Sequence, residues 1–258
     1  MRNSLWKSSL PMTLAVLASL GMQTVAHAQG RRGAGRAGPP QPAEAAAPID
    51  LTGYWTSLIT FDWRFRMVTP PPGDHEAVPL TAAGIEIMNA WDPAKDTAAG
   101  EQCKSYGAPI IMRVPGHLHV SWQDDQTMKM EIDTGQQTRL FHFARSADGR
   151  GAPSLQGYSV ASWDQQGRGG KKWGQLKVTT TDLTPGYIRK NGIPYSDKTS
   201  VLEYFDLMPQ QYQGETIMTV TSVVTDPVYL FQPFTTNDIF RKLPSGDSWK
   251  PTPCSATW

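Results

Sequence analysis

The sequence has no surplus of either charge. Its 258 residues include 24 Lys and Arg against 23 Asp and Glu, a formal net charge of +1. Removal of the predicted N-terminal signal described below takes away Arg2 and Lys7, which leaves 22 basic against 23 acidic residues and a net charge of −1. Proteins that bind nucleic acid through its phosphates need a basic surplus. We therefore expect no nucleic-acid partner.

The sequence also lacks an apolar run that could cross a membrane as a helix. The uncharged run near the N-terminus, residues 11–22, has 12 residues, whereas a spanning helix needs about 20. Arg2 and Lys7 precede this run, and small residues at positions 26 and 28 follow it, which is the pattern of a cleaved secretory signal. No twin arginine precedes the run and no cysteine follows the cut, so we expect no lipid anchor. The pattern predicts a signal peptide over residues 1–28, export to the periplasm and no transmembrane segment in the mature protein.

Residues 29–48 lack a periodic apolar face. They consist mainly of Gly, Ala, Pro and Arg. Such a segment cannot bury enough surface to offset its ordering entropy, so we predict a flexible leader. Its arginines could contact an anionic lipid or polymer, or the leader could be only a solvated tether.

The sequence has only two cysteines, Cys103 and Cys254. In an oxidising compartment an isolated pair is expected to form one disulfide, here closing a loop of about 150 residues. Two free thiols or a pair of metal ligands are the alternatives.

Alternating apolar and polar residues, separated by turn residues, predict a mainly antiparallel β protein. A helix is predicted over residues 79–93, with Thr81 as its N-cap and Asp92-Pro93 at its end. Asn191-Gly192 predicts a hairpin turn. Strands are expected over residues 51–68, 107–122, 127–133, 138–143, 158–163, 175–183, 201–207 and 216–224. Together these elements favour one domain over residues 49–258, an all-β barrel, closed or nearly closed, of about eight or nine strands with one short helix.

Short motifs add a family resemblance. "LTGYW" at the start of the first strand looks like the Gly-x-Trp opening of lipocalin-type (calycin) barrels. The chain more broadly resembles a family of uncharacterised secreted bacterial proteins with lipocalin-like features. The matching stretches are "WDPAKDTAAGEQCKSYGAPIIMR", "GYSVASW", "NGIPYS", "EYF" and "TVTSVVTDPVYLFQPF". The resemblance implies a lipocalin-like barrel and no particular reaction.

Three histidines lie in a predicted three-stranded meander over residues 117–143. A turn at Asp124-Asp125 pairs His119 with Met130, and a loop at residues 134–136, with Gly135 left-handed, pairs Glu131 with Arg139 as an ion pair. Because side chains alternate, this register decides which of them face the cavity. The predicted inner face carries His117, His119, Ser121, Met128, Met130, Ile132, Leu140 and His142, and the outer face carries Leu118, Val120, Trp122, Lys129, Glu131, Arg139 and Phe141.

The spacing His-x-His, with a third His 23 residues later, also resembles the zinc triad of α-class carbonic anhydrases. In the predicted register, however, one strand separates His119 from His142, a gap of about 9.6 Å. Zn–N bonds of about 2.0–2.1 Å leave little room for such a gap. We therefore expect no metal and no cofactor.

The stretch "FDWRFRMV" alternates aromatic and charged residues without a break. Read as a strand, it places an aromatic row on the barrel wall and the charges outside, although the same aromatics could fill a core without a ligand. The predicted ligand-binding residues are Phe61, Trp63, Phe65, Arg113, His117, Met128, Met130, Tyr158 and Tyr195.

Two functions fit these features. The first is an exported barrel that binds a small apolar or aromatic molecule in a cavity lined by Met, aromatic and His side chains. The alternative is a cofactor-independent isomerase, cyclase or lyase acting on a lipophilic molecule, with His119 and His142 as its acid and base. A packed barrel that serves only as an interaction domain is a third possibility.

Overall fold

The computed structural model describes residues 41–144, 150–166, 173–208 and 214–257. These residues belong to one compact unit, Pro40–Trp258. The predicted signal peptide, residues 1–28, and the predicted leader as far as residue 40 lie outside the described residues. Among the helices that are described, none has the length and apolar composition needed to cross a membrane.

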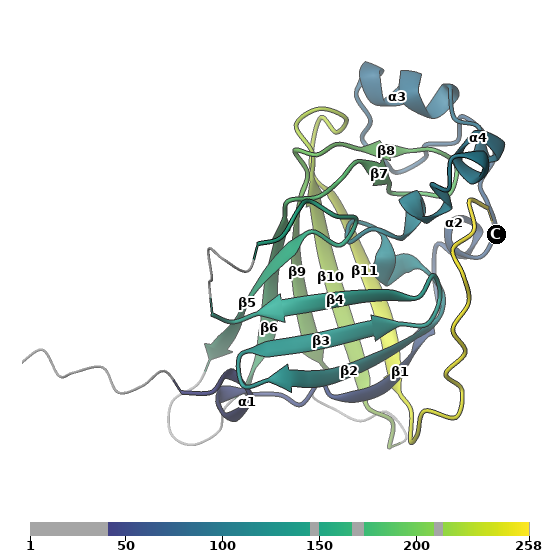
Figure 1. Ribbon diagram of the computed structural model, residues 1–258. Helices are drawn as coiled ribbons and strands as arrows, with labels where there is room; N and C mark the ends of the chain where they lie inside the picture. The colour runs from purple at the N-terminus through teal and green to yellow at the C-terminus, as the bar shows by residue number, and fades with distance from the viewer. Residues whose placement is uncertain (1–40, 145–149, 167–172, 209–213, 258) are drawn as a thin grey trace, which may run out of the picture. The chain divides into compact units, whose positions relative to one another are not determined.

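Nine strands close into a barrel (Figure 1). Each strand neighbours the next along the chain, except that the small hairpin of β7 (Gly186–Tyr187) and β8 (Pro194–Tyr195) leaves the ring between β6 and β9. The predicted fold class, a mainly antiparallel closed barrel, is confirmed. Its strands are β1 (Gly53–Leu58), β2 (His117–Asp124), β3 (Thr127–Ile132), β4 (Gln137–His142), β5 (Tyr158–Gln166), β6 (Trp173–Thr181), β9 (Ser200–Leu207), β10 (Ile217–Thr225) and β11 (Phe234–Lys242).

An odd number of strands makes one parallel pair unavoidable. Strands that alternate in direction around a closed ring must be even in number, so nine strands leave one mismatch. The mismatch falls between β4 and β5, which pair in parallel through Phe141 with Ser159 and His142 with Val160. The connection between them must return the chain to the end of the barrel where β4 begins.

Side chains fill the middle of the barrel. Trp55, Phe141, Phe205 and Phe240 are each at most 1% exposed and belong to one apolar cluster. The Trp55 indole N–H donates to the Leu51 carbonyl at 2.9 Å, so its single polar group is satisfied. The middle of the barrel is therefore a packed core.

The long first strand predicted over residues 51–68 is wrong beyond Leu58. The chain turns through Asp62, whose φ is +55°, and forms the short helix α2 (Trp63–Arg66). The expected directions are reversed: Trp63 is 63% exposed, while Arg66 is 1% exposed. Phe61 and Met67 are exposed as well. The helical turn brings Arg66 inward, where it forms an ion pair with Asp238. The predicted aromatic wall is therefore not formed.

Short helices gather beyond one end of the barrel (Figure 1). The predicted N-cap is confirmed, since Thr81 Oγ1 accepts from Gly84 N at the start of α3 (Ala82–Asn89). Asp92-Pro93 does not end this helix. It begins α4 (Pro93–Ala98), with Asp92 as N-cap and Pro93 in the first turn, where the missing N–H has no cost.

The same end of the barrel is covered by two 3₁₀ turns. The predicted strand over residues 107–122 is helical at its start, because η1 (Gln102–Tyr106) and η2 (Ile111–Arg113) precede β2. Tyr106, Ile111 and Met112 belong to the same apolar cluster as the barrel interior. We call this the capped end of the barrel.

The predicted register of β2, β3 and β4 is wrong by one residue at each turn. A bulge between Trp122 and Asp124 pairs Val120, not His119, with Met130. At the second turn Ile132 pairs with Gln137, which makes the loop one residue longer than predicted, although Gly135 has the expected left-handed φ of +81°.

These slips reverse two strands relative to the third. In β3, Met128, Met130 and Ile132 face inward as predicted. In β2 and β4 the residues predicted to face outward face inward instead. The inward residues are Leu118, Val120, Trp122, Met128, Met130, Ile132, Arg139 and Phe141. The predicted ion pair between Glu131 and Arg139 is absent: Glu131 instead pairs with Lys129 at 3.0 Å on the outer face.

Arg139 forms an ion pair inside the barrel. Both its terminal nitrogens donate to the Glu203 carboxylate, at 2.9 and 2.5 Å, and both side chains are fully buried. Thr180 accepts a further hydrogen bond from Arg139 at 3.2 Å. A bidentate pair of this kind joins β4 to β9 across the interior.

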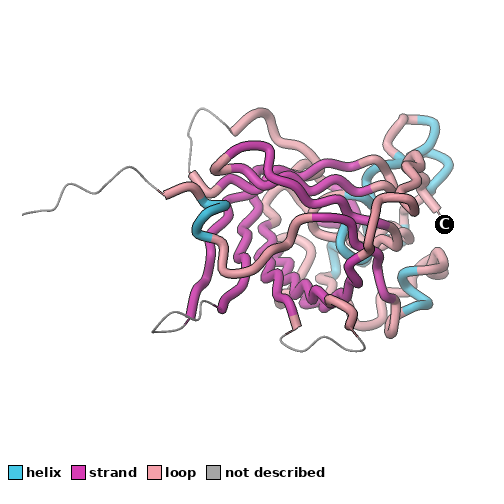
Figure 2. Tube along the Cα trace, turned by 90° about the horizontal axis from the view of Figure 1, so that it is seen from below, coloured by secondary structure: helices cyan, strands magenta, loops and turns pink. Residues whose placement is uncertain are grey.

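The end of the predicted leader is ordered rather than flexible. Residues 41–48 contain α1 (Ala43–Ala46), which lies at the turn between β2 and β3 (Figure 1). Figure 2 shows this short helix beside one end of the strands. Ala43 N donates to Asp125 O at 2.8 Å, and the Trp163 indole donates to Ala43 O at 2.8 Å. These contacts satisfy backbone groups and bury Ala43. They offset the conformational entropy lost when this segment is ordered, although its composition had predicted a flexible segment. We call this the α1 end of the barrel.

The predicted disulfide between Cys103 and Cys254 is confirmed, with a Cα–Cα distance of 5.1 Å. It fastens the C-terminal segment to η1. The same segment is held to the β3–β4 loop, where Gly135 N donates to Thr252 O at 2.9 Å and Thr252 N donates to Asp133 O at 3.0 Å.

Replacing Cys103 and Cys254 together by Ala should lower the free energy of unfolding by about 2–5 kcal/mol, because the cross-link no longer restricts the unfolded chain. Urea denaturation of both proteins under non-reducing conditions measures the change. An unchanged midpoint would show that the backbone contacts alone fix the C-terminal segment.

Removing one partner of the buried pair should destabilise the barrel more than removing both. Glu203→Gln leaves the Arg139 charge uncompensated and should cost about 3–5 kcal/mol. The double change Arg139→Met with Glu203→Met should recover much of that loss, since apolar groups of similar volume take over. Urea midpoints of the two variants test this, and a double variant no more stable than Glu203→Gln would contradict it.

Candidate functional site

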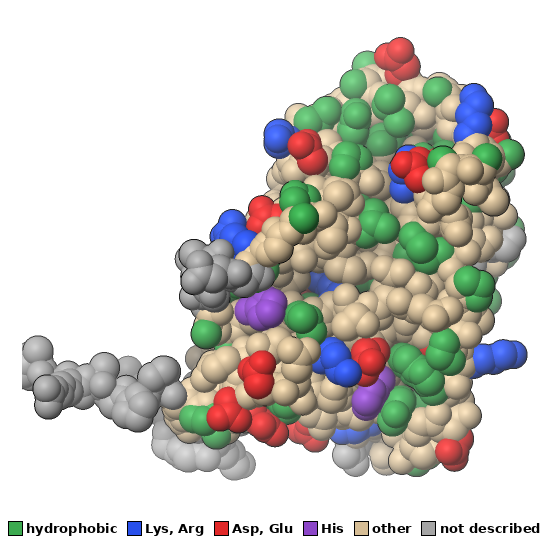
Figure 3. Space-filling view, viewed as in Figure 1, with side chains coloured by type: hydrophobic (Ala, Val, Ile, Leu, Met, Phe, Trp, Pro, Cys, Tyr) green, Lys and Arg blue, Asp and Glu red, His purple; other side chains and the backbone are tan. Residues whose placement is uncertain are grey.

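The predicted inward placement of His117 and His119 is wrong. His119 Nδ1 lies 3.1 Å from Glu131 Oε2, and its ring stacks on Tyr54 with centroids 4.3 Å apart. His117 Nδ1 lies 2.7 Å from Asp133 Oδ2. Figure 3 shows histidine side chains reaching the surface on this face of the molecule. Both imidazoles therefore contact carboxylates outside the barrel interior.

His142 also lies on the outer face, because its neighbour Phe141 fills the interior. The rings of His142 and Tyr158 stack, with centroids 4.9 Å apart. They line an external pocket of about 220 Å³ together with Arg150 and Asp182. Burial lowers the pKa of His142, against an opposing effect of Asp124. A catalytic pair of His119 and His142 inside the barrel, the basis of the enzyme alternative, is not formed.

The other predicted ligand residues are scattered. Met128 and Met130 are fully buried core residues of the barrel, and Tyr195 packs in a second apolar cluster at the capped end. Phe61 and Trp63 are exposed beside α2, and Phe65 lies between the guanidinium groups of Arg64 and Arg189. The structure thus does not unite the predicted set around one cavity. Among the described residues, no group of three His, Cys, Asp or Glu side chains is arranged to hold a metal ion.

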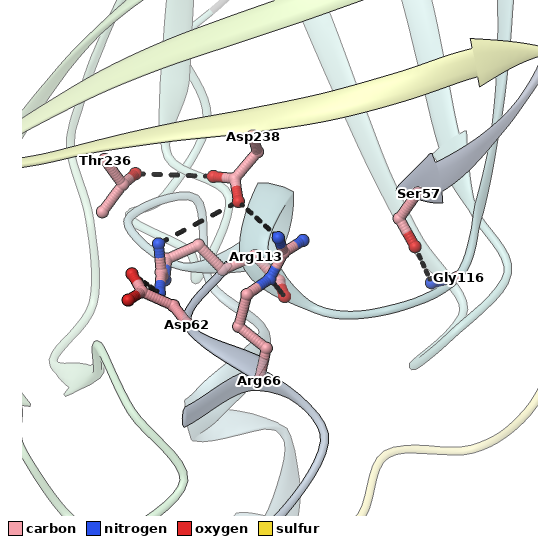
Figure 4. Close-up of polar contacts among 7 residues, drawn as sticks. All are labelled: Ser57, Asp62, Arg66, Arg113, Gly116, Thr236 and Asp238. Atoms are coloured by element: carbon pink, nitrogen blue, oxygen red, sulfur yellow. Dashed lines mark hydrogen bonds and ion pairs between the residues drawn. The ribbon is translucent and has the colours of Figure 1, made fainter. Parts of the chain in front are cut away.

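Arg113, another predicted ligand residue, belongs to an ion cluster at the capped end (Figure 4). Its Nη2 lies 3.1 Å from Asp62 Oδ2, and its Nη1 lies 4.0 Å from Asp238 Oδ1. Arg66 Nη1 approaches the same Asp238 oxygen at 3.2 Å, and Arg66 Nε donates to the Arg113 carbonyl at 2.9 Å. The arginines of α2 and η2 therefore meet at one carboxylate, Asp238, which projects inward from β11.

Burial governs the charge of Asp238. It raises the pKa of this carboxyl to about 6, against the opposing effect of Arg66 and Arg113. Thr236 donates to its other oxygen at 3.4 Å. The carboxylate thus has few hydrogen bonds for a fully buried group and depends on the two arginines.

A larger pocket lies at the α1 end, where the sequence analysis placed no site residue. It has a volume of about 600 Å³ and is bounded by the ends of β5, β6, β9 and β10 and by the segment that follows α1. Its apolar lining is Pro48, Ile49, Trp173, Leu207 and Met208, and its other lining residues are Asp164, Gly174, Gln175, Asp206 and Thr219.

The polar lining residues form one row across four strands. Asp164 pairs with Gln175, and Asp206 pairs with Thr219. The register of Leu176 with Phe205 sets Gln175 beside Asp206. Burial and the nearby charge of Asp164 raise the pKa of Asp206. Each residue of the row neighbours an inward residue, Trp163, Leu176, Phe205 or Met218, so the row projects from the outer face of the sheet.

The sequence held a partial signal for this pocket. Exposed Trp173 and Met208 stand at strand ends, where turn residues would be expected. Asp164 and Asp206 lie far apart in the sequence, so only the order of strands in the ring reveals their proximity. The missing information was the pairing of β6 with β9.

No protein-family model, curated protein or solved structure matches this chain. The family resemblance drawn from sequence motifs therefore stays a prediction. The function of the barrel is inferred from the residues at its two ends.

Asp206→Asn should stabilise the protein at pH 7, because it removes a carboxylate whose ionised form is disfavoured in the folded state. Since the folded-state pKa is raised, the wild-type penalty exists above that pKa and vanishes below the ordinary value of about 3.8. The gain in urea midpoint should therefore shrink as the pH falls from 7 to 4. Asp197→Asn, an exposed control, should change little at either pH; equal pH profiles for the two variants would refute this.

Proposed function

We propose that this protein is an exported barrel that binds a small, largely apolar or aromatic molecule at the α1 end. The pocket of about 600 Å³ carries this proposal. Small-molecule sites commonly measure about 300–1,000 Å³ and combine an apolar lining with a few polar groups. The site lies at a barrel end rather than in the interior, which is packed.

The lining favours a ligand with an apolar body and no negative charge. Trp173, Leu207 and Met208 supply apolar and polarisable surface, and Ile49 closes one side. The carboxylates of Asp164 and Asp206 project from the outer face beside the pocket and disfavour an anion near it. A neutral aromatic amine or alcohol therefore fits better than an organic acid.

Export is supported by two features. The disulfide between Cys103 and Cys254 is of the kind that persists in oxidising compartments such as the periplasm. The sequence pattern over residues 1–28 matches a secretory signal. Periplasmic localisation is part of the proposal.

Titration with N-phenyl-1-naphthylamine, a neutral fluorescent aromatic amine, tests the site. The mature protein should bind the dye, and the double change Trp173→Ala with Met208→Ala should weaken binding about tenfold. This corresponds to about 1.4 kcal/mol, in the range expected when part of two apolar contacts is lost.

Phe231→Ala is the matched control, since Phe231 is an equally exposed aromatic residue beside α3. It should leave the dye affinity unchanged. If the double variant and the control bind the dye equally, or if the wild type does not bind it, the proposed site is wrong.

A further inference from the structure

The capped end buries more positive than negative charge. Arg66, Arg113 and Arg189 are each at most 4% exposed, whereas Asp238 is the one buried carboxylate among the described residues that ion-pairs with these arginines. An uncompensated buried charge is strongly unfavourable. Some further group of negative charge would relieve this imbalance.

Several guanidinium N–H groups in this cluster lack a hydrogen-bond acceptor. Within the part of the chain that the structure describes, these are Nη1 and Nη2 of Arg66, Nη1 of Arg113, and Nε and Nη1 of Arg189. The ion pairs of Arg66 and Arg113 with Asp238 do not meet hydrogen-bond geometry. Three arginines thus keep donors available at one place.

These arginines line a common small cavity. It measures about 10 Å³, close to the space that one water molecule needs. Its lining residues are Phe65, Arg66, Ser105, Ile110, Arg113, Val114, Arg189 and Lys190. No carboxylate is among them, so the cavity wall is formed by cations, Ser105 and apolar groups. Its size limits an occupant to a single atom or to one end of a carboxylate.

Within the described residues, the hydrogen bond of Arg189 goes to a backbone carbonyl rather than to a carboxylate. Its Nη2 donates to the Glu76 carbonyl at 2.7 Å, and its guanidinium lies 3.9 Å from the Phe65 ring centroid. Burial, followed by repulsion from Arg113, lowers the pKa of Arg189 to about 10. The position of this cation is therefore fixed by packing rather than by a local anion.

The acidic residues around the cluster do not neutralise it from inside. Asp62 is 46% exposed, and Glu76 is an exposed partner of Arg64 on the surface. Asp74 opposes the lowering of the Arg189 pKa, and its carboxylate accepts a hydrogen bond from Glu76 N. Solvent screens such outer charges, whereas an anion in the cavity would contact the buried donors directly.

We propose that the capped end of the barrel is a binding site for a small anion, a halide ion or the carboxylate group of an organic acid, between Arg66, Arg113 and Arg189. The site lies in the loops that cap the barrel and does not depend on ligand binding at the α1 end.

Thermal unfolding in different sodium salts at constant ionic strength tests this site. Chloride, bromide, acetate and benzoate are titrated against methanesulfonate, a monovalent anion without a carboxylate, whose tetrahedral head group is too large for the cavity. A bound anion should raise the melting temperature saturably, and the dependence on concentration gives the Kd. Crystals grown in bromide should show an anomalous peak between the three guanidinium groups.

Arg189→Met identifies the site. The change keeps an unbranched side chain over Phe65 and removes one donor set, so it should weaken anion binding at least tenfold. In methanesulfonate the variant should be as stable as the wild type or more so, because a buried like-charge repulsion is gone. Arg241→Met, at an exposed arginine paired with Glu215, is the control and should keep the full anion response.

The outcomes are distinct. Stabilisation by halides alone identifies an inorganic ion, and stronger stabilisation by acetate or benzoate identifies the carboxylate of an organic acid. No stabilisation beyond methanesulfonate, or an equal response in Arg189→Met, overturns the proposal. If Arg189→Met does not fold, wild-type crystals grown in bromide and in acetate decide: a cavity that holds neither anion overturns it.

Discussion

The capped end is organised by one buried carboxylate. Closure of the sheet turns Asp238 of β11 toward the interior, where water cannot solvate it. Arg66 and Arg113 then reach it from two separate segments, α2 and η2. To bring Arg66 inward, the chain after β1 must turn through Asp62 and coil, which leaves Trp63 on the surface. The need for a counterion therefore outweighs the preference of an alternating aromatic stretch for a strand.

Local signals predicted the elements that local physics controls. The alternation in β5, β6, β9 and β10, the Thr81 cap and the left-handed Gly135 depend on neighbours in sequence. The register of β2 and β4 does not: it depends on a bulge before Asp124 and on Asp133. The Asp133 carboxylate accepts from His117 N, and its backbone carbonyl accepts from Thr252 N. A one-residue difference in register exchanges the two faces of a strand. The candidate histidines were therefore predicted on the inner face, whereas they lie on the outer face.

The two ends of the barrel have opposite chemistry because different segments close them. At the α1 end, the ordered end of the leader adds Pro48 and Ile49 to a pocket bordered by Asp164 and Asp206. At the capped end, loops bring arginines to a small cavity. The packed core between them, with Arg139 and Glu203 paired across it, excludes a continuous channel through its filled middle. A ligand at one end therefore makes no contact with a ligand at the other.

The disulfide extends this organisation to the C-terminus. Cys103 lies in η1, three residues before Tyr106, whose hydroxyl accepts from Lys190 Nζ at 2.5 Å and from Ser255 N at 3.1 Å. Lys190 Nζ also donates to the Ser255 carbonyl at 3.1 Å. Burial lowers the pKa of Lys190 to about 7, so these contacts hold an amine whose charge is only partly retained at neutral pH. Cys254 directly precedes Ser255, so the disulfide fixes the segment whose carbonyl accepts from Lys190. The cross-link and the buried lysine therefore form one structural unit.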